Sequence, residues 1–137
     1  MLKNKFIKVH SVDDNSVIII NYSNIITVGK DTGRQNDITT VYIDDDNNEG
    51  ITVNESVEKI YQNIISTIGN KSDFLILHSN ENNSAIIVNT KYINIIYRET
   101  EYDYTSIAIC DNDSIEEITV NETPEKIFQY IEDNLSK

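Results

Sequence analysis

A fourteen-residue segment occurs twice in this chain. Residues 51–64 read ITVNESVEKIYQNI and residues 118–131 read ITVNETPEKIFQYI, so that ten of the fourteen positions are identical at a constant offset of 67. A repeat of this kind predicts a tandem duplication, with a first unit over residues 1–69 and a second unit over residues 70–137. Both units must then contain the same succession of strands and helices.

Runs of β-branched and aromatic residues predict four or five antiparallel strands in each unit. These runs cover residues 6–10, 16–21, 25–28, 38–43 and 51–53 in the first unit, and residues 74–79, 85–89, 93–96, 104–109 and 118–120 in the second. The apolar period then changes to that of a helix, with a stripe that starts at Val57 in the first unit and at Ile127 in the second. Ser56 and Thr123 are placed to cap these helices, and Pro124 suits the first helical position.

The expected fold class is α+β, with two tandem strand-rich units that each end in one helix and are related by a pseudo-twofold axis. A unit of about 65 residues is marginal alone, because it buries only about 60 % of its chain surface. We therefore expect the units to pack as one body around a single apolar interior. Residues 74–77 are apolar on both strand faces, whereas Lys8 stands in the counterpart strand, so the second unit is expected to be the more enclosed. Pairing of strand edges, or a helix over the neighbouring sheet, would cover the open edges.

The chain is strongly acidic, with a formal net charge of −12. This charge repels phosphate and anionic lipid, so nucleic acid is disfavoured as a partner and no membrane binding is expected. No apolar run reaches the roughly 18 residues of a membrane span, and the first residues do not form the apolar core of a signal peptide. Cys110 is the single cysteine, which excludes an internal disulfide and fits a reducing compartment. We expect the protein in the cytoplasm, or within a virion or another intracellular assembly.

The strand ends and helix entries of both units resemble the small flagellar and swarming-motility proteins of the FlbD type. The matching residues are 20–21, 25–26 and 53–60 in the first unit, and 88–89, 93, 96, 105–107 and 118–127 in the second. The resemblance implies a strand-rich fold that ends in a helix, a non-catalytic accessory role, and no active-site residues or cofactor to carry over. The family has a single unit with a glycine in its last hairpin, whereas this chain is doubled and residues 111–117 contain no glycine.

An acidic segment offers a candidate cation site. Asp44, Asp46 and Asn48 alternate along the chain and are followed by Gly50, as oxygen ligands are at the start of calcium-binding loops. The glycine falls one position later than an EF-hand loop requires, and Glu55 is expected to belong to the start of the helix. The alternative is a solvated hairpin tip, so no metal is predicted.

Two histidines occupy equivalent places in the two units. His10 and His78 each end a first strand and are each followed by Ser, so they could share a metal or act as a proton switch. The alternative is a strand-end side chain bonded to the neighbouring turn. Cys110 lies beside Asp111 and Asp113, whose charge opposes thiolate formation, so a nucleophilic role is not expected.

A tyrosine-rich segment is the candidate partner-binding surface. Tyr97, Tyr102 and Tyr104 lie among acidic residues, and tyrosine is enriched at interfaces because it carries a large area with little rotamer entropy. The alternative is an ordinary hairpin with cross-strand tyrosine pairs.

The sequence favours a non-enzymatic protein-interaction or structural module, such as an adaptor, an assembly subunit or a virion component. It contains no glycine-rich phosphate loop and no metalloprotease, hydrolase or CxxC motif. A small regulatory nucleic-acid-binding protein is the alternative, which the net charge opposes.

Overall fold

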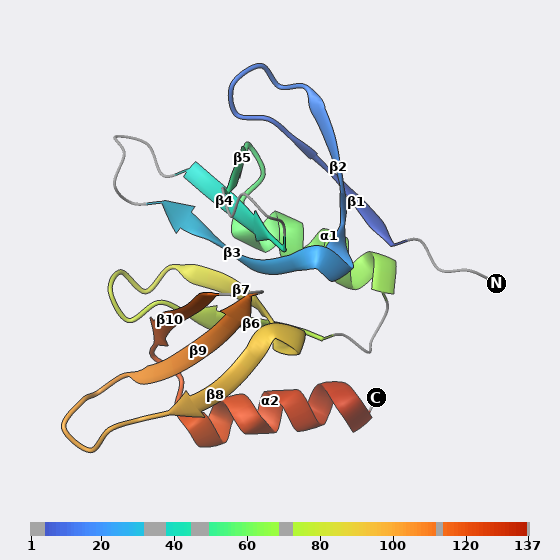
Figure 1. The fold of residues 1–137 in the computed structure, drawn as a ribbon. Coiled ribbons are helices and arrows are strands. Elements are labelled where there is room, and N and C mark those ends of the chain that lie inside the picture. Colours follow the sequence, from blue (N-terminus) through green and yellow to red (C-terminus); the bar gives the residue numbers. More distant parts are fainter. Residues whose placement is uncertain (1–4, 32–37, 45–49, 69–72, 112–113, 137) are drawn as a thin grey trace.

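The β-rich character expected from the sequence is seen in a computed structural model of the chain, which describes residues 5–31, 38–44, 50–68, 73–111 and 114–136. These residues form ten strands in three antiparallel sheets, two α-helices and two short 3-10 helices (Figure 1). The α+β fold class is therefore confirmed, with five strands and one closing helix in each unit.

Both units contain the same elements in the same order. The first consists of β1 (Phe6–His10), β2 (Val17–Asn21), a 3-10 helix (Tyr22–Asn24), β3 (Ile25–Asp31), β4 (Ile38–Ile43), β5 (Ile51–Val53) and α1 (Val57–Ile68). The second consists of β6 (Phe74–His78), β7 (Ala85–Asn89), a 3-10 helix (Thr90–Tyr92), β8 (Ile93–Tyr97), β9 (Thr105–Asp111), β10 (Ser114–Val120) and α2 (Pro124–Ser136). The predicted elements are confirmed, and β10 begins four residues before the predicted strand.

The two helices begin at the predicted caps. The hydroxyl of Ser56 accepts a hydrogen bond from the backbone N–H of Lys59 at 3.1 Å, and that of Thr123 accepts one from Lys126 at 3.1 Å. Each hydroxyl satisfies one N–H group that the first helical turn leaves without an intrahelical acceptor. Gly69 follows α1 in the sequence, at a position where glycine commonly ends a helix, but it lies outside the described residues.

The sheet order shows that the second unit contributes a hairpin to the sheet of the first unit. The five-stranded sheet runs β5-β4-β3-β7-β6, so the β6–β7 hairpin of the second unit extends the sheet of the first (Figure 1). Thr27 lies opposite Val88, and Val28 lies opposite Ile87, in antiparallel register. The amide of Asn89 is buried and donates a hydrogen bond to the backbone oxygen of Ile25 at 2.8 Å. Edge pairing thus covers β3, as the sequence suggested.

The hairpin β6–β7 is buried on both faces. Phe74, Ala85 and Ile87 belong to a cluster that also contains the residues of α1 and of the first unit's strands. The opposite face contributes Leu75 and Val88 to a second cluster with residues of β9, β10 and α2. The first strand of the second unit is therefore enclosed on both faces, as residues 74–77 predicted, whereas Ile95 and Phe128 of the same unit are exposed. The prediction of a single shared apolar interior is wrong, because the hairpin separates two cores that each contain residues of both units.

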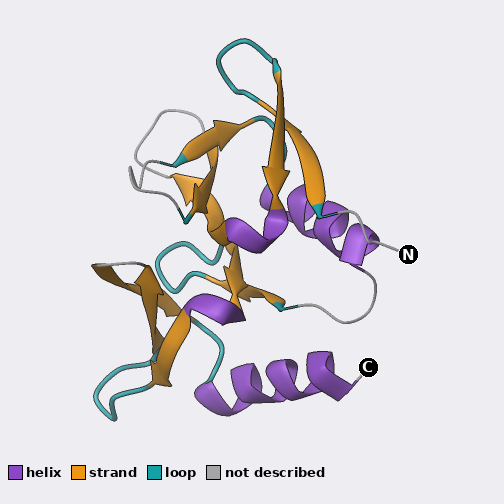
Figure 2. Cartoon of the chain, turned by 45° about the vertical axis from the view of Figure 1, so that its right-hand side comes forward, coloured by secondary structure: helices purple, strands orange, loops and turns teal. Residues whose placement is uncertain are grey.

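The pairing between the units is not reciprocal. Within the described strands, β2 pairs with β1 alone and β8 pairs with β9 alone. The β1–β2 hairpin and the β8–β10 sheet lie at opposite ends of the molecule in both ribbon views (Figures 1 and 2). The structure therefore does not confirm the expected pseudo-twofold axis. None of the described helices is long and apolar enough to cross a membrane.

Equivalent isoleucines in the two hairpins give a direct test of this packing. Ile87→Ala is expected to lower the free energy of unfolding by about 3 kcal/mol, because Ile87 is fully buried and its truncation leaves a cavity. The matched change Ile19→Ala, 68 positions earlier, is expected to cost less than about 0.5 kcal/mol, because that side chain is 59 % exposed. Urea unfolding at low protein concentration measures both. Equal losses at the two positions would contradict the buried hairpin.

Candidate functional site

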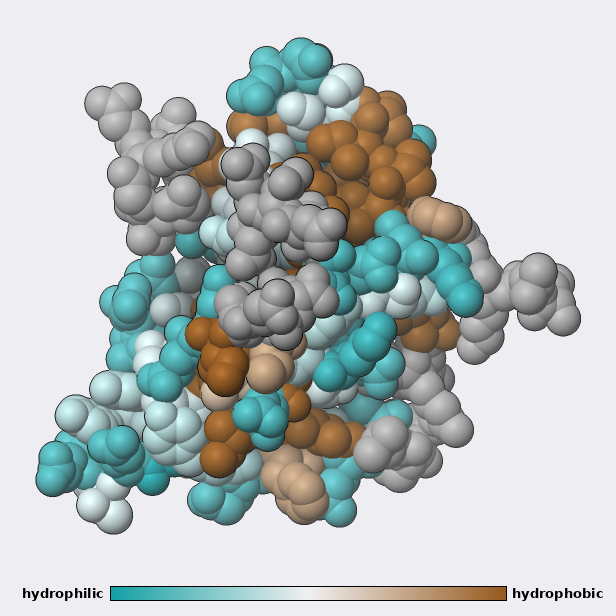
Figure 3. Space-filling view, in the orientation of Figure 1, coloured by the Kyte–Doolittle hydropathy of each residue, from teal (hydrophilic) through white to brown (hydrophobic). Residues whose placement is uncertain are grey.

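The β1–β2 hairpin carries an exposed apolar face. Phe6, Val17 and Ile19 are 49, 56 and 59 % exposed, and Figure 3 shows hydrophobic residues gathered over this hairpin. Their equivalents in the second unit, 68 positions later, are Phe74, Ala85 and Ile87, which are 2, 8 and 0 % exposed. The first hairpin thus presents to solvent the face by which the second hairpin packs on the first unit. We call Phe6, Val17 and Ile19 the hairpin face.

A second open surface lies on the other unit. Among the described strands, β8 pairs with β9 alone and forms a sheet edge, and Ile95 on it is 51 % exposed. On α2, Phe128 is 60 % exposed, and Ile131 is half-buried where its equivalent Ile64 is fully buried. The β8 residues that pack against the core under α2 are Ile93 and Ile96, so Ile95, next to Ile96, lies on the other face of the sheet. We call Phe128, Ile131 and the edge of β8 the acceptor surface. Exposed apolar patches next to an open strand edge are typical of protein interaction sites.

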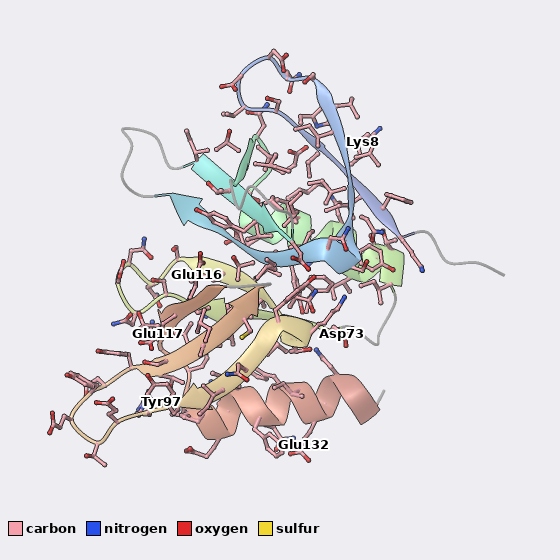
Figure 4. All side chains as sticks on the ribbon, in the orientation of Figure 1. Lys8, Asp73, Tyr97, Glu116, Glu117 and Glu132 are labelled. Atoms are coloured by element: carbon pink, nitrogen blue, oxygen red, sulfur yellow. The ribbon has the colours of Figure 1, made fainter. Side chains whose placement is uncertain are left out.

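The structure brings together two of the three tyrosines singled out in the sequence. Tyr102 and Tyr104 stack at the β8–β9 turn with ring centroids 5.1 Å apart and an interplanar angle of 26°, and Tyr102 is 45 % exposed. Tyr97 lies on β8 and donates its hydroxyl to Glu117 on β10 at 3.0 Å (Figure 4). This hydrogen bond, with a smaller contribution from burial, raises the pKa of Tyr97 above 10.0. The stacked pair is therefore the part of the predicted surface that remains available to a partner.

Both histidines bind a glutamate at the entry of a helix. The side chains of His10 and Glu55 meet at 2.6 Å between Nδ1 and Oε2, and those of His78 and Glu122 meet at 2.7 Å between the same atoms. In each pair the other carboxylate oxygen accepts the histidine's own backbone N–H, at 2.9 Å and 3.0 Å. The alternative predicted a bond from each histidine to the neighbouring turn. The partner is instead a glutamate 45 positions away for His10 and 44 positions away for His78.

The two glutamates were not identified as site residues from the sequence, although both lie in the duplicated segment. Each ties the end of a first strand to the start of the closing helix, which is a structural contact present in both units. For Glu55, burial raises the pKa, but the hydrogen bonds from the His10 ring and backbone outweigh it, so the pKa lies below its ordinary value of 4.5. The carboxylate is therefore the form that the fold stabilises.

The hairpin turn of each unit is held by a second repeated contact. Asn54 donates its amide to the side chain of Asn15 at 2.9 Å, and Asn121 donates to Asn83 at 2.8 Å. Asn15 and Asn83 both have a positive φ, 61° and 60°, which asparagine tolerates better than most residues. These contacts fix the first hairpin of each unit against the strand that leads into the helix.

The candidate cation site is only partly within the described residues. Asp46 and Asn48 lie outside them. The Oδ2 atom of Asp44 accepts a hydrogen bond from the hydroxyl of Tyr92 at 3.2 Å, which links the two units. A side chain at Gly50 would clash with Thr40 on the neighbouring strand, so close packing explains this glycine without a bound ion.

An open groove of about 380 Å³ lies beside the junction of the units. Its walls include Lys30 and Tyr42 from the first unit and Glu81 and Glu117 from the second, among small hydroxyl side chains. Within the part of the chain that the structure describes, no three His, Cys, Asp or Glu residues are grouped so as to hold a metal ion. Cys110 is exposed near the end of β9.

No family model, curated protein or solved structure matches this chain. The resemblance to the FlbD type therefore stays a prediction from the sequence, and the site is interpreted from its own geometry.

The His10–Glu55 pair predicts an acid-dependent contribution to stability. Glu55→Gln is expected to lower the free energy of unfolding at pH 7 by about 1–2 kcal/mol, because it weakens two hydrogen bonds to a carboxylate. Since the folded-state pKa of Glu55 is below 4.5, its contribution is present above pH 4.5 and is lost as the pH falls through the folded-state pKa. The difference between the two proteins should therefore shrink as the pH is lowered from 4.5, as measured by urea unfolding.

Glu58→Gln is the matched control, because Glu58 is exposed in the first turn of the same helix. This substitution is expected to change the free energy of unfolding little at any pH. A Glu55→Gln difference that stays constant down to acid pH would contradict the role of the charged carboxylate.

Proposed function

We propose that this chain is a non-enzymatic protein-interaction module, an adaptor or assembly subunit, that binds a protein partner by extending a β-sheet. The observation that carries the proposal is the hairpin face, which is exposed in the first unit while its equivalent is buried in the second. The β6–β7 hairpin demonstrates within one chain that such a hairpin can join a neighbouring sheet and pack on its core. Main-chain pairing gives such contacts affinity, and the side chains of the apolar face give them specificity.

A structural role for the histidines supports the non-catalytic part of the proposal. Both pairs, His10–Glu55 and His78–Glu122, have nearly the same geometry although the surroundings of the two units differ. A catalytic group would need this geometry in one place, whereas a contact that closes each unit is needed in both. The net charge of −12 opposes the alternative of nucleic-acid binding.

The stacked tyrosine pair is a second contact surface within the same proposal. Tyr102 and Tyr104 are held against one another, so little side-chain entropy would be lost when a partner covers them. A module of this kind would connect two proteins, one at the hairpin face and one at the β8–β9 turn. Such a role fits an adaptor or a component of a virion or another large assembly.

Site-specific photocross-linking in the cells that produce the protein tests the proposal. A benzophenone amino acid in place of Val17 is expected to give covalent adducts with a protein, because Val17 lies on the hairpin face and is 56 % exposed. The same group in place of Tyr102 tests the tyrosine surface. Adducts are read as mass-shifted bands and identified by mass spectrometry.

Gln62 on α1 is the matched control position, because it is exposed but lies outside both surfaces. Adducts at Val17 with none at Gln62 are the expected result. If irradiation gave no protein adduct at Val17 or at Tyr102, the interaction role would be refuted.

A further inference from the structure

We infer that the protein that occupies the hairpin face is a second copy of this chain, docked head to tail. In this arrangement the β1–β2 hairpin of one copy pairs with strand β8 of the next and packs on its helix α2. The inference rests on the proposed function and names its partner. It follows from the contact that already joins the two units inside one chain.

The internal junction fixes the register of this contact. Inside the chain, Val28 of β3 lies opposite Ile87 of β7. The equivalents of these residues, by the 68-position offset, are Ile96 of β8 and Ile19 of β2, so Ile96 of one copy would lie opposite Ile19 of the next. The bond that Asn89 donates to the Ile25 oxygen would be repeated from Asn21.

Both halves of the contact are present and open on the same molecule. The β1–β2 hairpin lies at one end of the molecule, and β8 with α2 lies at the other (Figures 1 and 2). Among the described strands, β2 pairs only with β1 and β8 only with β9, so each has an open edge. Of the eight large hydrophobic residues that are exposed among the described residues, four lie on these two surfaces: Phe6, Val17, Ile19 and Phe128. A second copy would cover them, and the burial of apolar surface is the main favourable contribution to such an association.

One pair of charged residues, on the hairpin and on α2, is opposite in sign. On the hairpin, Lys8 stands where the second unit has Ile76, and on the acceptor helix Glu132 stands where the first unit has Ile65. Ile76 lies against the core that α1 covers, so Lys8 lies on the face by which the hairpin would dock, while Glu132 is exposed on the helix that would receive it. Figure 4 shows Lys8 on the first hairpin and Glu132 on α2.

Two substitutions make the contact between copies weaker than the internal junction. Asn94 stands at the position of Ile26, which is buried across the junction, and Thr90 stands at that of Tyr22, whose ring packs edge-on against Phe74. The association is therefore expected to be reversible and to depend on concentration. Because the contact uses two different surfaces, repetition gives a ring or an open filament rather than a twofold dimer.

Cysteine cross-linking of the full-length chain tests the register. On a Cys110→Ser background, one protein carries Ile19→Cys and another carries Ile96→Cys. Mild oxidation of the mixture is expected to give a disulfide-linked dimer, because directly opposed strand residues lie within the Cα separation that a disulfide spans. Neither protein alone should give the disulfide-linked dimer, since residue 19 of one copy lies opposite residue 96 of the next copy and not opposite another residue 19.

Matched variants separate this contact from unspecific association. Ile115→Cys is the control partner for Ile19→Cys, because Ile115 is 69 % exposed but lies on β10, away from both surfaces, and it should give no dimer. Asn94→Ile should shift sedimentation of the protein toward larger species, whereas Gln62→Ile, which adds the same exposed side chain on α1, should not. Ile19→Asp should abolish association while Ile115→Asp leaves it intact.

The outcomes distinguish this inference from the proposed function. A mixture that gives no dimer between positions 19 and 96, together with a monomer at all concentrations in sedimentation, would overturn the second copy as partner. Photoadducts of Val17 with a different protein would then leave the interaction role standing. Absence of both the disulfide and any photoadduct would overturn the two together.

Discussion

The structure depends on one contact, the insertion of the β6–β7 hairpin between the two cores. Its outer face supplies Phe74, Ala85 and Ile87 to the first core, and its inner face supplies Leu75 and Val88 to the second. Backbone pairing with β3 and the buried Asn89 amide fix the register of the insertion. Because the hairpin satisfies both cores at once, the two small units stabilise each other although each alone would bury too little surface.

The local elements could be predicted from the sequence because each depends on nearby residues. Alternating β-branched residues gave the strands, and the change of apolar period with the caps Ser56 and Thr123 gave the helices. The two-sided apolar character of residues 74–77 also indicated correctly that this strand is enclosed. The sheet order could not be predicted. The alternation of apolar and polar residues along a strand indicates which face is buried, but it does not indicate which strand lies next to it.

In the candidate site, too, contacts between residues close in sequence could be predicted and contacts between distant residues could not. The tyrosine pair was identified because its residues are close in sequence, whereas the His10–Glu55 contact joins positions 45 residues apart. Glu55 already had a local explanation at the start of the helix, so nothing in its neighbourhood pointed to His10. The signal was the duplication itself, which retained both His and Glu in each unit while many other positions changed.

The exposed hairpin face lies on a strongly acidic chain, and the two features oppose each other in any contact between copies. An open strand edge beside Val17 and Ile19 is an association hazard that proteins commonly limit with charged residues, and Lys8 lies on this hairpin. The net charge of −12 adds a repulsion between copies that acts at every approach. In the docking inferred above, backbone pairing and burial of the apolar face in one register offset that repulsion. The acidic composition therefore selects against loose aggregation while permitting the specific docking of a hairpin, which is the contact that already holds the two units together.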